Sequence, residues 1–437
     1  MNFIRTDGEL ARNSCYDATV KRPQGFARLQ ADVSCDVAVV GGGLAGLSAA
    51  IELADRGYSV VLLEARQVGA GASGRNGGQA LAGLACDQST IEAQLGMDEA
   101  RRIWAMTLEA LDLITQRCER FGIDCEWQPG YLSLAVNARK AHELRQWHTH
   151  MQANYGDATL WIDERELPKW IASPRFHSGI HDARSGHLHP LKYTLGLARA
   201  AATQGVRIFE NTPVTGLMPG ATARLQTPQG EVRAAHVLLA GNVYLQDLAP
   251  KLASRIMPVG TYIVASAPVD PALLGSLIPS RSAVCDTNFV LDYFRPTADH
   301  RMLYGGRVSY STSTPINLAT SMQRRMARSF PQLADTPVEY AWGGFVDISM
   351  NRAPDFGRLS ELMGPAYGNV CYLQGFSGHG LALTGLAGKL VAEAIDGDAR
   401  RFDTFARIRH RKFPGGRLLR TPALVLGMAY YQLKDMF

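Results

Sequence analysis

The hydrophobic pattern of residues 36–79 predicts a strand, a turn, a helix and a second strand in succession. Residues 37–40 form an apolar, partly β-branched run, which is typical of a strand buried on both faces of a parallel sheet. Apolar positions recur at helical spacing through residues 44–54, and Gly57 is placed to end that helix. A second apolar run follows at residues 60–63. The pattern therefore predicts a β-α-β unit.

The turn between the first strand and the helix is a G-x-G-x-x-G motif formed by Gly41, Gly43 and Gly46. The first glycine permits the tight turn, the second lets the backbone approach a pyrophosphate, and the third lets the helix pack close to the sheet. Glu64 ends the second strand, 18 residues after Gly46, where its carboxylate can accept hydrogen bonds from ribose hydroxyls. The motif alone is weak, but strand, turn, helix, strand and acid in this order predict a dinucleotide site.

The segment 69–79, GAGASGRNGGQ, is richer in glycine than a core element or an ordinary connection. At this point the chain resembles the superfamily of FAD enzymes that includes D-amino-acid oxidase, glycine oxidase and sarcosine oxidase. In that superfamily such a run wraps the pyrophosphate and reaches the flavin ring. The wording GASGRNGGQ is similar in particular to bacterial γ-glutamylputrescine (γ-glutamylpolyamine) oxidases. A flexible surface loop is the alternative interpretation.

Three later segments extend the resemblance. Residues 212–214 match a segment whose valine holds the adenine, and residues 235–242 match one that passes under the dinucleotide, with Asn at position 242 in place of Gly. Residues 375–380, GFSGHG, lead from a strand into a helix, and the resemblance places them against the flavin pyrimidine, where a helix N-terminus stabilises negative charge. The predicted cofactor contacts are Gly41, Gly43, Leu44, Ala45, Gly46, Glu64, Ala65, Arg66, Gly71, Ala72, Ser73, Arg75, Asn76, Gly77, Gly78, Gln79, Val214, Gly241, Gly375, Phe376, Ser377, Gly378, His379 and Gly380.

The remaining pattern predicts a second domain. Helical periodicity at residues 98–120 and 138–154 interrupts the mononucleotide-fold units, and period-two patterning at residues 256–345 indicates an antiparallel sheet. We expect an α/β (α+β overall) fold, with a Rossmann-type FAD-binding domain interleaved with a largely antiparallel substrate domain. The predicted divisions are an N-terminal lead-in (1–30), the FAD-binding domain (31–95, 182–250 and 346–410), the substrate domain (96–181 and 251–345) and a C-terminal basic segment and helix (411–437).

Aromatic residues of the antiparallel region are the candidates for the substrate cavity, namely Tyr262, Tyr304, Trp342 and Phe345. Simple core packing is the alternative for each of them. The resemblance implies hydride removal from the carbon beside an amine nitrogen. That step requires a neutral amine, which an apolar cavity favours by penalising the ammonium form. The flavin does the chemistry, so no catalytic side chain is assigned.

One departure from the superfamily pattern narrows the class of substrate. Amino-acid oxidases of the superfamily carry an arginine that clamps the α-carboxylate, but here the expected position is Val346 or its neighbour. Asp347 beside it would favour a cation, or it is a structural acid. Without that arginine, an amine that lacks a carboxylate at the reacting carbon is favoured. The stretches NRAPDFGRL and QGFSGHGLALTGLAG resemble γ-glutamylputrescine oxidases, and this resemblance implies a γ-glutamylated polyamine oxidised to an aldehyde, ammonia and hydrogen peroxide. The alternatives are oxidation of another amine or amino acid (glycine, sarcosine or a D-amino acid), electron transfer to a quinone, and a non-redox nucleotide-binding module.

The positions of cysteine and histidine and the net charge limit how the cofactor is attached and which partners are expected. No cysteine lies in residues 286–370, where sarcosine oxidases attach flavin, and no histidine lies in residues 69–79, so we expect noncovalent FAD. His187 and His189 lack the acid or cysteine cluster of a metal site. A net charge of +5 over 437 residues does not indicate nucleic-acid binding. The expected partners are a small-molecule amine and oxygen or another electron acceptor.

The cysteines and the two ends of the chain bear on location. Seven cysteines without a C-x-x-C motif, and a start without a signal-like apolar run, predict reduced thiols in a cytoplasmic protein. Near the C-terminus, basic residues precede an apolar run at 423–431 that is too short to span a bilayer. That segment either packs on the protein as a terminal helix or lies on anionic lipid.

Overall fold

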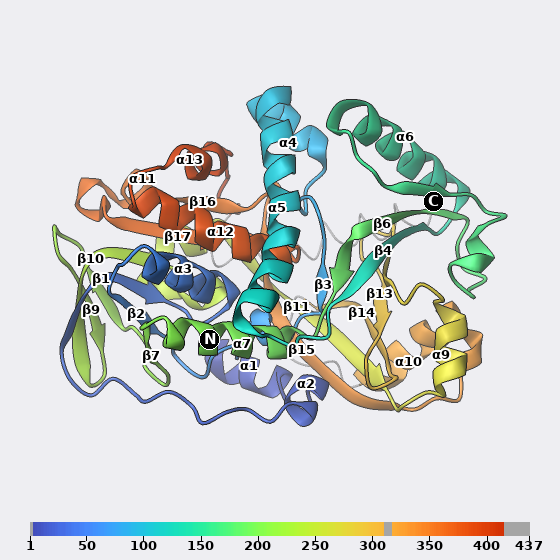
Figure 1. Cartoon of the computed structure of the whole chain (residues 1–437), viewed down its shortest axis with the longest axis horizontal. Coiled ribbons are helices and arrows are strands. Elements are labelled where there is room, and N and C mark those ends of the chain that lie inside the picture. Colours follow the sequence, from blue (N-terminus) through green and yellow to red (C-terminus); the bar gives the residue numbers. More distant parts are fainter. Residues whose placement is uncertain (1–2, 310–316, 415–437) are drawn as a thin grey trace.

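Two β-sheets and the helices around them form the protein (Figure 1). The computed structural model describes residues 3–309 and 317–414. The glycine-rich segments predicted to hold the cofactor lie where the two sheets meet, because both sheets contribute residues to the same cavity.

The first sheet has eight strands, and its central strands run parallel. The strands run in the order β16 (Asp355–Arg358), β17 (Val370–Gln374), β10 (Gly230–Leu239), β1 (Val33–Val40), β2 (Val60–Leu63) and β7 (Arg207–Phe209). Two further strands, β8 (Gly216–Met218) and β9 (Ala223–Thr227), continue antiparallel beside β10. In β1, Val37 and Val39 enter one core and Ala38 and Val40 the other, as expected for a strand covered on both faces.

Helices cover one face of this sheet closely. The core there is built by α3 (Leu44–Asp55), α5 (Met97–Phe121), α7 (Pro190–Thr203) and α12 (Gly380–Ile395). The backbones of α3 and α12 approach each other at Gly388, where an added Cβ would lie 2.5 Å from the backbone nitrogen of Ala49. Beside this contact the hydroxyl of Ser48 donates a 2.6 Å hydrogen bond to the carbonyl of Gly385. The two glycine-led helices therefore begin side by side at the same edge of the sheet (Figure 1).

The second sheet has nine strands and is antiparallel apart from the pair β4 and β12. Its order is β15 (Val338–Ser349), β11 (Ile256–Ser266), β14 (Met302–Ser309), β13 (Tyr293–Pro296), β12 (Ala283–Asp286), β4 (Gln128–Ala135), β6 (Ser178–His187) and β3 (Gln79–Ala80), with β5 (Leu160–Ile162) beside β6. The antiparallel sheet predicted at residues 256–345 is thus confirmed by the pairing of β11 with β14 and β15. The longest strand, β15, ends at the cavity, so this sheet forms the cavity wall opposite the glycine turns.

The remaining helices and 3-10 turns complete the described chain. The other α-helices are α1 (Phe3–Leu10), α2 (Cys15–Thr19), α4 (Gln88–Leu95), α6 (Ala138–Tyr155), α8 (Pro250–Ala253), α9 (Pro271–Leu277), α10 (Leu318–Ser329), α11 (Ser360–Met363) and α13 (Arg400–Ala406). The 3-10 turns are η1 (Ala72–Gly74), η2 (Leu167–Lys169), η3 (Asn242–Tyr244), η4 (Gln246–Leu248), η5 (Pro331–Leu333) and η6 (Pro365–Tyr367). The lead-in holds α1 and α2, and it buries Asp7 and Tyr16 against the body of the protein.

Two predicted domain boundaries cut through strands. The boundary at residue 182 falls within β6 and the one at residue 346 within β15, and both strands belong to the nine-stranded sheet. The segment 96–181 also differs from its predicted assignment, because Ile103 and Leu111 of α5 share a core with α3 and α12. Local periodicity identifies an element but does not say which sheet or core it joins.

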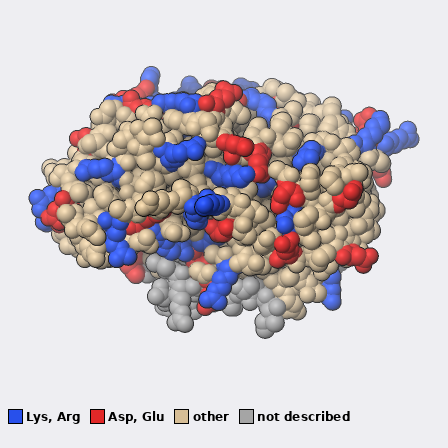
Figure 2. Space-filling model, turned by 60° about the horizontal axis from the view of Figure 1, so that its bottom comes forward, with Lys and Arg blue, Asp and Glu red and all other residues tan. Residues whose placement is uncertain are grey.

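The outer surface shows no strong sorting of charge on the face drawn in Figure 2, where basic and acidic side chains are interspersed. None of the helices within residues 3–309 and 317–414 is both long and apolar enough to cross a membrane. The predicted C-terminal helix and its apolar run lie in residues 415–437, outside the described part of the chain.

Candidate functional site

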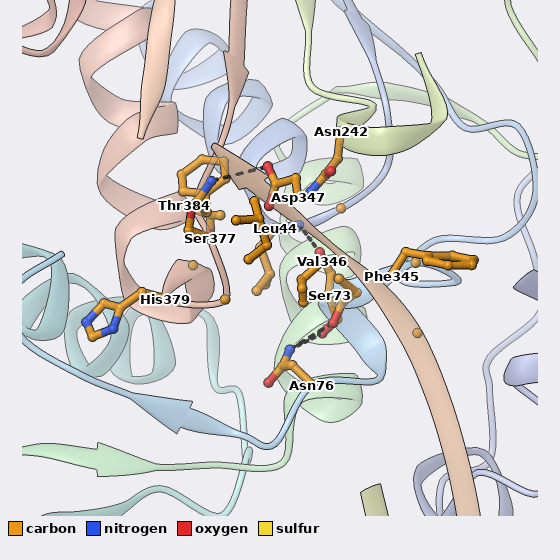
Figure 3. A pocket seen from close by; sticks show the side chains of 18 of the residues that line it. Leu44, Ser73, Asn76, Asn242, Phe345, Val346, Asp347, Ser377, His379 and Thr384 are labelled. Carbon is orange, nitrogen blue, oxygen red and sulfur yellow. Dashed lines mark hydrogen bonds between the residues drawn. The ribbon is translucent and has the colours of Figure 1, made fainter. Parts of the chain in front are cut away.

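A cavity of about 850 Å³ lies at the carboxyl ends of the parallel strands. Val40, Leu63 and Ala240, which end or follow β1, β2 and β10, line it together with the end of β15. Ligands of open α/β sheets bind in the crevice at this edge. Figure 3 shows the side chains around it: Ser73 and Asn76 come from the glycine-rich loop, Val346 and Asp347 from β15, and Ser377, His379 and Thr384 from the turn and helix after β17.

The first glycine turn leaves space where a side chain would obstruct the helix start. Gly41 has a φ of +115°, which favours glycine, and a Cβ at Gly46 would lie 2.0 Å from the carbonyl oxygen of Gly41. Gly43 caps α3 without a side-chain hydrogen bond, and the Leu44 amide donates to the Ser73 hydroxyl at 2.9 Å. The positive end of the α3 dipole is therefore directed at the cavity and suits a pyrophosphate.

Glu64 stands at the tip of β2, as predicted. Its two carboxylate oxygens accept backbone hydrogen bonds from Gly42 at 2.7 Å and from Arg66 at 2.9 Å. Burial raises the pKa of Glu64, against the opposing effect of these two amides. The carboxylate is thus held in one orientation beside the glycine turn, and it lines the cavity.

The glycine-rich loop 69–79 is packed and internally bonded. The side-chain amide of Asn76 donates to the Ala72 carbonyl at 3.0 Å, and its oxygen accepts from the Gly78 amide at 2.8 Å. The phenol of Tyr16 donates to the Asn76 carbonyl at 3.0 Å. This network contradicts the alternative of a flexible surface loop.

Arg66 and Arg75 line the cavity, but their guanidinium groups are engaged with Asp7 of α1. Nη2 of Arg66 lies 2.6 Å and Nη2 of Arg75 lies 2.7 Å from Oδ2 of Asp7. The phenol of Tyr244 donates to Oδ1 of Asp7 at 2.8 Å. Sequence reasoning missed Asp7 and Tyr244, because nothing in their local sequence marks them as partners of the loop.

The second glycine turn, residues 375–380, is held by Asp347. Oδ2 of Asp347 accepts hydrogen bonds from the Gly375 and Phe376 amides, the latter at 3.2 Å, and the carboxyl is almost fully buried. Burial raises the pKa of Asp347 to about 6, and the bonds from these amides act in the opposite direction. Asp347 is therefore the structural acid of the two interpretations, because it binds backbone amides of the turn.

The same turn directs a second helix N-terminus at the cavity. Gly375 and Gly378 have φ values of +76° and +85°, and α12 begins at Gly380 without a side-chain cap. His379 contacts the Ala82 carbonyl through Nε2 at 3.0 Å, and burial lowers the pKa of His379. Two helix dipoles from opposite ends of the sequence thus converge on one cavity.

Most of the predicted cofactor contacts line this one cavity. They are Gly41, Gly43, Leu44, Ala45, Glu64, Ala65, Arg66, Gly71, Ala72, Ser73, Arg75, Asn76, Gly77, Gln79, Val214, Gly241, Phe376, Ser377, Gly378, His379 and Gly380. Three predicted contacts do not line the cavity, namely Gly46, Gly78 and Gly375. Each of them instead permits a close approach of backbone atoms. Asn242, which replaces the family's glycine, has a φ of +53°, a conformation that asparagine tolerates.

The predicted substrate aromatics are corrected by the structure. Only Phe345 of the four lines the cavity. Tyr262 and Tyr304 are fully buried in the core of the nine-stranded sheet, and Trp342 packs against Tyr16 with its indole nitrogen 3.0 Å from the Arg75 carbonyl. Alternation in a strand does not reveal which face meets the cavity. The Tyr and Phe residues that line it besides Phe345 are Tyr131, Tyr244, Phe289, Tyr293, Phe376 and Phe413.

The two histidines of the H-x-H motif have other roles. Nε2 of His187 contacts the Arg281 carbonyl at 2.9 Å, and its Nδ1 faces Arg295 at 3.4 Å. His189 caps α7 by accepting a hydrogen bond from the Lys192 amide. Within residues 3–309 and 317–414, no group of three or more His, Cys, Asp or Glu side chains is placed to hold a metal ion.

The residues present fit an adenine dinucleotide with a flavin end. The residues that line the cavity include Val214 and Glu64, the start of α3 and the turn before α12. Its volume lies within the range of cofactor and substrate pockets. An added Cβ would meet backbone atoms at Gly41 and Gly46, and at Gly43 it would lie 2.8 Å from the hydroxyl oxygen of Ser73.

Comparisons with known proteins agree with this geometry. The family model described as DAO, FAD dependent oxidoreductase, matches residues 36–394. The chain is 40% identical to the γ-glutamylputrescine oxidoreductase of Escherichia coli over 97% of this chain and 98% of the relative. It is 38% identical to a probable oxidoreductase OrdL of Haemophilus influenzae over 92% of each chain.

The fold has solved counterparts. The glycine oxidase of Geobacillus kaustophilus superposes with a TM-score of 0.71 at 22% identity, covering 86% of this chain and 99% of that one. This likeness confirms the expected fold. The chain therefore belongs to the DAO family of FAD-dependent oxidoreductases, so it is an enzyme and its cofactor is FAD.

Proposed function

We propose that this oxidoreductase removes the terminal amino group of a γ-glutamylated polyamine such as γ-glutamylputrescine. One observation carries the proposal: the 40% identity to the Escherichia coli γ-glutamylputrescine oxidoreductase extends over nearly the whole of both chains. In the reaction, the primary amine, oxygen and water give the aldehyde, ammonia and hydrogen peroxide. We further propose that FAD is held noncovalently and that the enzyme works in the cytoplasm.

The chemistry divides between cofactor and protein. Bound FAD supplies the acceptor for a hydride from the carbon beside the amine nitrogen. The protein's part is to bind, orient and desolvate the amine. Apolar side chains at the cavity, among them Leu81, Leu84, Val290 and Leu291, support this role because burial disfavours the ammonium form.

The charges around the cavity support a substrate whose carboxylate lies far from the reacting carbon. Val346 lines the cavity at the place where an arginine fork was expected, and the Asp347 carboxyl is engaged with backbone amides. Arg352 also lines the cavity, with its guanidinium carbon 5.6 Å from the centre of the Phe289 ring. A cation in this position suits the carboxylate at the glutamyl end of the substrate.

The test is anaerobic bleaching of the flavin by substrate. The holoenzyme is mixed in parallel with γ-glutamylputrescine, free putrescine, sarcosine, glycine and D-alanine. We expect rapid bleaching by the γ-glutamylated amine and little by the others. Bleaching by an amino acid, with none by γ-glutamylputrescine, would contradict the proposal and favour oxidation of another amine or amino acid.

Two further measurements complete the assignment. Reoxidation of the bleached enzyme by oxygen, compared with reoxidation by a soluble quinone, identifies the electron acceptor. Precipitation with trichloroacetic acid tests whether FAD is bound covalently. We expect the yellow colour to stay in the supernatant, and yellow colour in the protein pellet would contradict noncovalent binding.

A further inference from the structure

Two cysteines outside the cavity are in direct contact. Cys118 lies near the end of α5, Cys125 lies in the connection to β4, and their sulfur atoms are 3.4 Å apart. All seven cysteines of the chain fall within the described residues, and all are free thiols. Among them, this is the pair whose sulfur atoms touch.

The backbone holds the two thiols together through a tight reversal. Gly122 ends α5 with a φ of +59°, and the Ile123 amide donates to the Cys118 carbonyl at 2.9 Å. A disulfide bond is about 2.05 Å long, so the sulfur atoms must approach by about 1.4 Å for one to form. A change of that size is within reach of side-chain rotation.

The two thiols differ in exposure and acidity. Cys118 is partly exposed, whereas Cys125 is buried. The hydrogen bond from Cys125 lowers the pKa of Cys118, and the same contact together with burial raises the pKa of Cys125. The accessible thiol is thus the better nucleophile, and its neighbour is placed to react second.

We propose that Cys118 and Cys125 form a peroxide-responsive pair that closes to an intrachain disulfide. The Cys118 thiolate attacks hydrogen peroxide, which breaks the O–O bond, gives a sulfenic acid and releases hydroxide that takes up a proton. The Cys125 sulfur then attacks the Cys118 sulfur, forms the S–S bond and expels water. Overall, two thiols and one peroxide give one disulfide and two waters, and the thiols are the reductant.

The pair is connected to the cofactor loop. The carbonyl of Cys125 accepts a 2.7 Å hydrogen bond from the amide of His189, which caps α7. From α7, the Thr194 hydroxyl donates to the Ser73 carbonyl of the glycine-rich loop at 3.2 Å. The pair is therefore joined by hydrogen bonds to the helix that contacts the cavity loop.

The test uses the reduced holoenzyme with graded additions of hydrogen peroxide. Remaining thiols are alkylated in denaturant, and peptides are mapped by mass spectrometry. We expect a cross-linked peptide pair containing residues 118 and 125, lighter by two hydrogens, two fewer alkylated thiols and full reversal by dithiothreitol. Because peroxide is added, the result does not depend on the proposed oxidase reaction.

Two variants sharpen the test. In Cys125→Ser, we expect a sulfenic acid on Cys118, trapped by dimedone, and loss of the cross-link. Cys35→Ser, which changes another partly exposed thiol, should leave the cross-link intact. The proposal is overturned if Cys118 and Cys125 both remain alkylatable at peroxide levels that oxidise Cys35 or Cys86, or if Cys118 cross-links to a different cysteine.

Discussion

The carboxylate of Asp7 lies 2.7 Å from the guanidinium of Arg75, across 68 residues of sequence. Asp7 is completely buried, and Arg75 is 5% exposed. Arg66 and Tyr244 complete the cluster around the same carboxylate. The N-terminal helix therefore supplies one carboxylate that is shared by two guanidinium groups beside the cofactor site.

Replacing Asp7 by Asn tests this link. The substitution leaves two guanidinium groups without their carboxylate, and breaking a buried ion pair costs about 3–5 kcal/mol. We expect a lower melting temperature and weaker retention of FAD, measured by calorimetry and by flavin released on dilution. Asp17→Asn is the control, since its carboxylate pairs with Arg22 at the surface. Equal behaviour of the two variants would show that the Asp7 cluster does not support the loop.

Replacing Asp347 by Asn tests the support of the second glycine turn. Asn retains the shape but offers a weaker, uncharged acceptor to the amides of Gly375 and Phe376. Hydrogen bonds to a charged group contribute about 1.5–3 kcal/mol, so the FAD dissociation constant should rise about tenfold or more. Fluorescence titration of the apoprotein measures it. Glu361→Gln, at an exposed site on α11, should bind FAD as the parent does.

Replacing His187 by Gln tests a pH effect. Burial, with the charge of Arg295 second, lowers the pKa of His187 to about 3 from 6.5. The folded state thus keeps His187 neutral while the unfolded chain gains a proton below pH 6.5. This contribution to stability is complete above that pH and is lost as the pH falls toward 3.

Between pH 7 and pH 5 the loss attributable to His187 is about 2 kcal/mol. Denaturant unfolding at both pH values should therefore show a smaller acid-induced loss for His187→Gln than for the parent. His142→Gln, which alters an exposed histidine of α6, should keep the parental difference. An unchanged difference in His187→Gln would mean that this histidine is not kept neutral by burial.

Replacing Gly46 by Ala tests the close packing of α3 on the glycine turn. The new Cβ would lie 2.0 Å from the Gly41 carbonyl oxygen, a contact that the backbone must move to relieve. We expect loss of bound flavin, read from the visible spectrum of the purified protein. Gly275→Ala in α9 meets no atom within 4 Å and should retain full flavin content. A yellow Gly46→Ala protein would contradict the assigned geometry.

The cavity wall is tested by Phe345→Ala against Tyr262→Phe. Phe345 packs in the same core as Tyr262 but also lines the cavity, so truncating it should raise the KM for the amine by about tenfold, consistent with 1–3 kcal/mol for lost apolar contact. Tyr262 lies in the core away from the cavity, so the KM of Tyr262→Phe should stay within about twofold of the parental value. A larger increase in KM for Tyr262→Phe than for Phe345→Ala would indicate that Tyr262 contacts the substrate.

The dinucleotide unit could be predicted from the sequence because its chemistry is local. The strand, glycine turn, helix and acid of residues 36–64 are adjacent in the chain, and Gly46 is required by a backbone contact with the nearby Gly41 carbonyl. The same is true of the turn at residues 375–380, where φ values favour glycine at two positions. The aromatic side chains were less predictable, since a strand pattern separates two faces but does not say which face borders a cavity.

The sequence by itself determined the cofactor class, because backbone conformation and short-range spacing create a dinucleotide cradle. Only the tertiary structure decided which distant groups complete it: Asp7 on the arginines, Asp347 on the second turn, and Cys118 against Cys125. Burial supplies the reason. A buried charge or amide must find a partner, and the fold chooses that partner by proximity in space rather than by spacing in the chain.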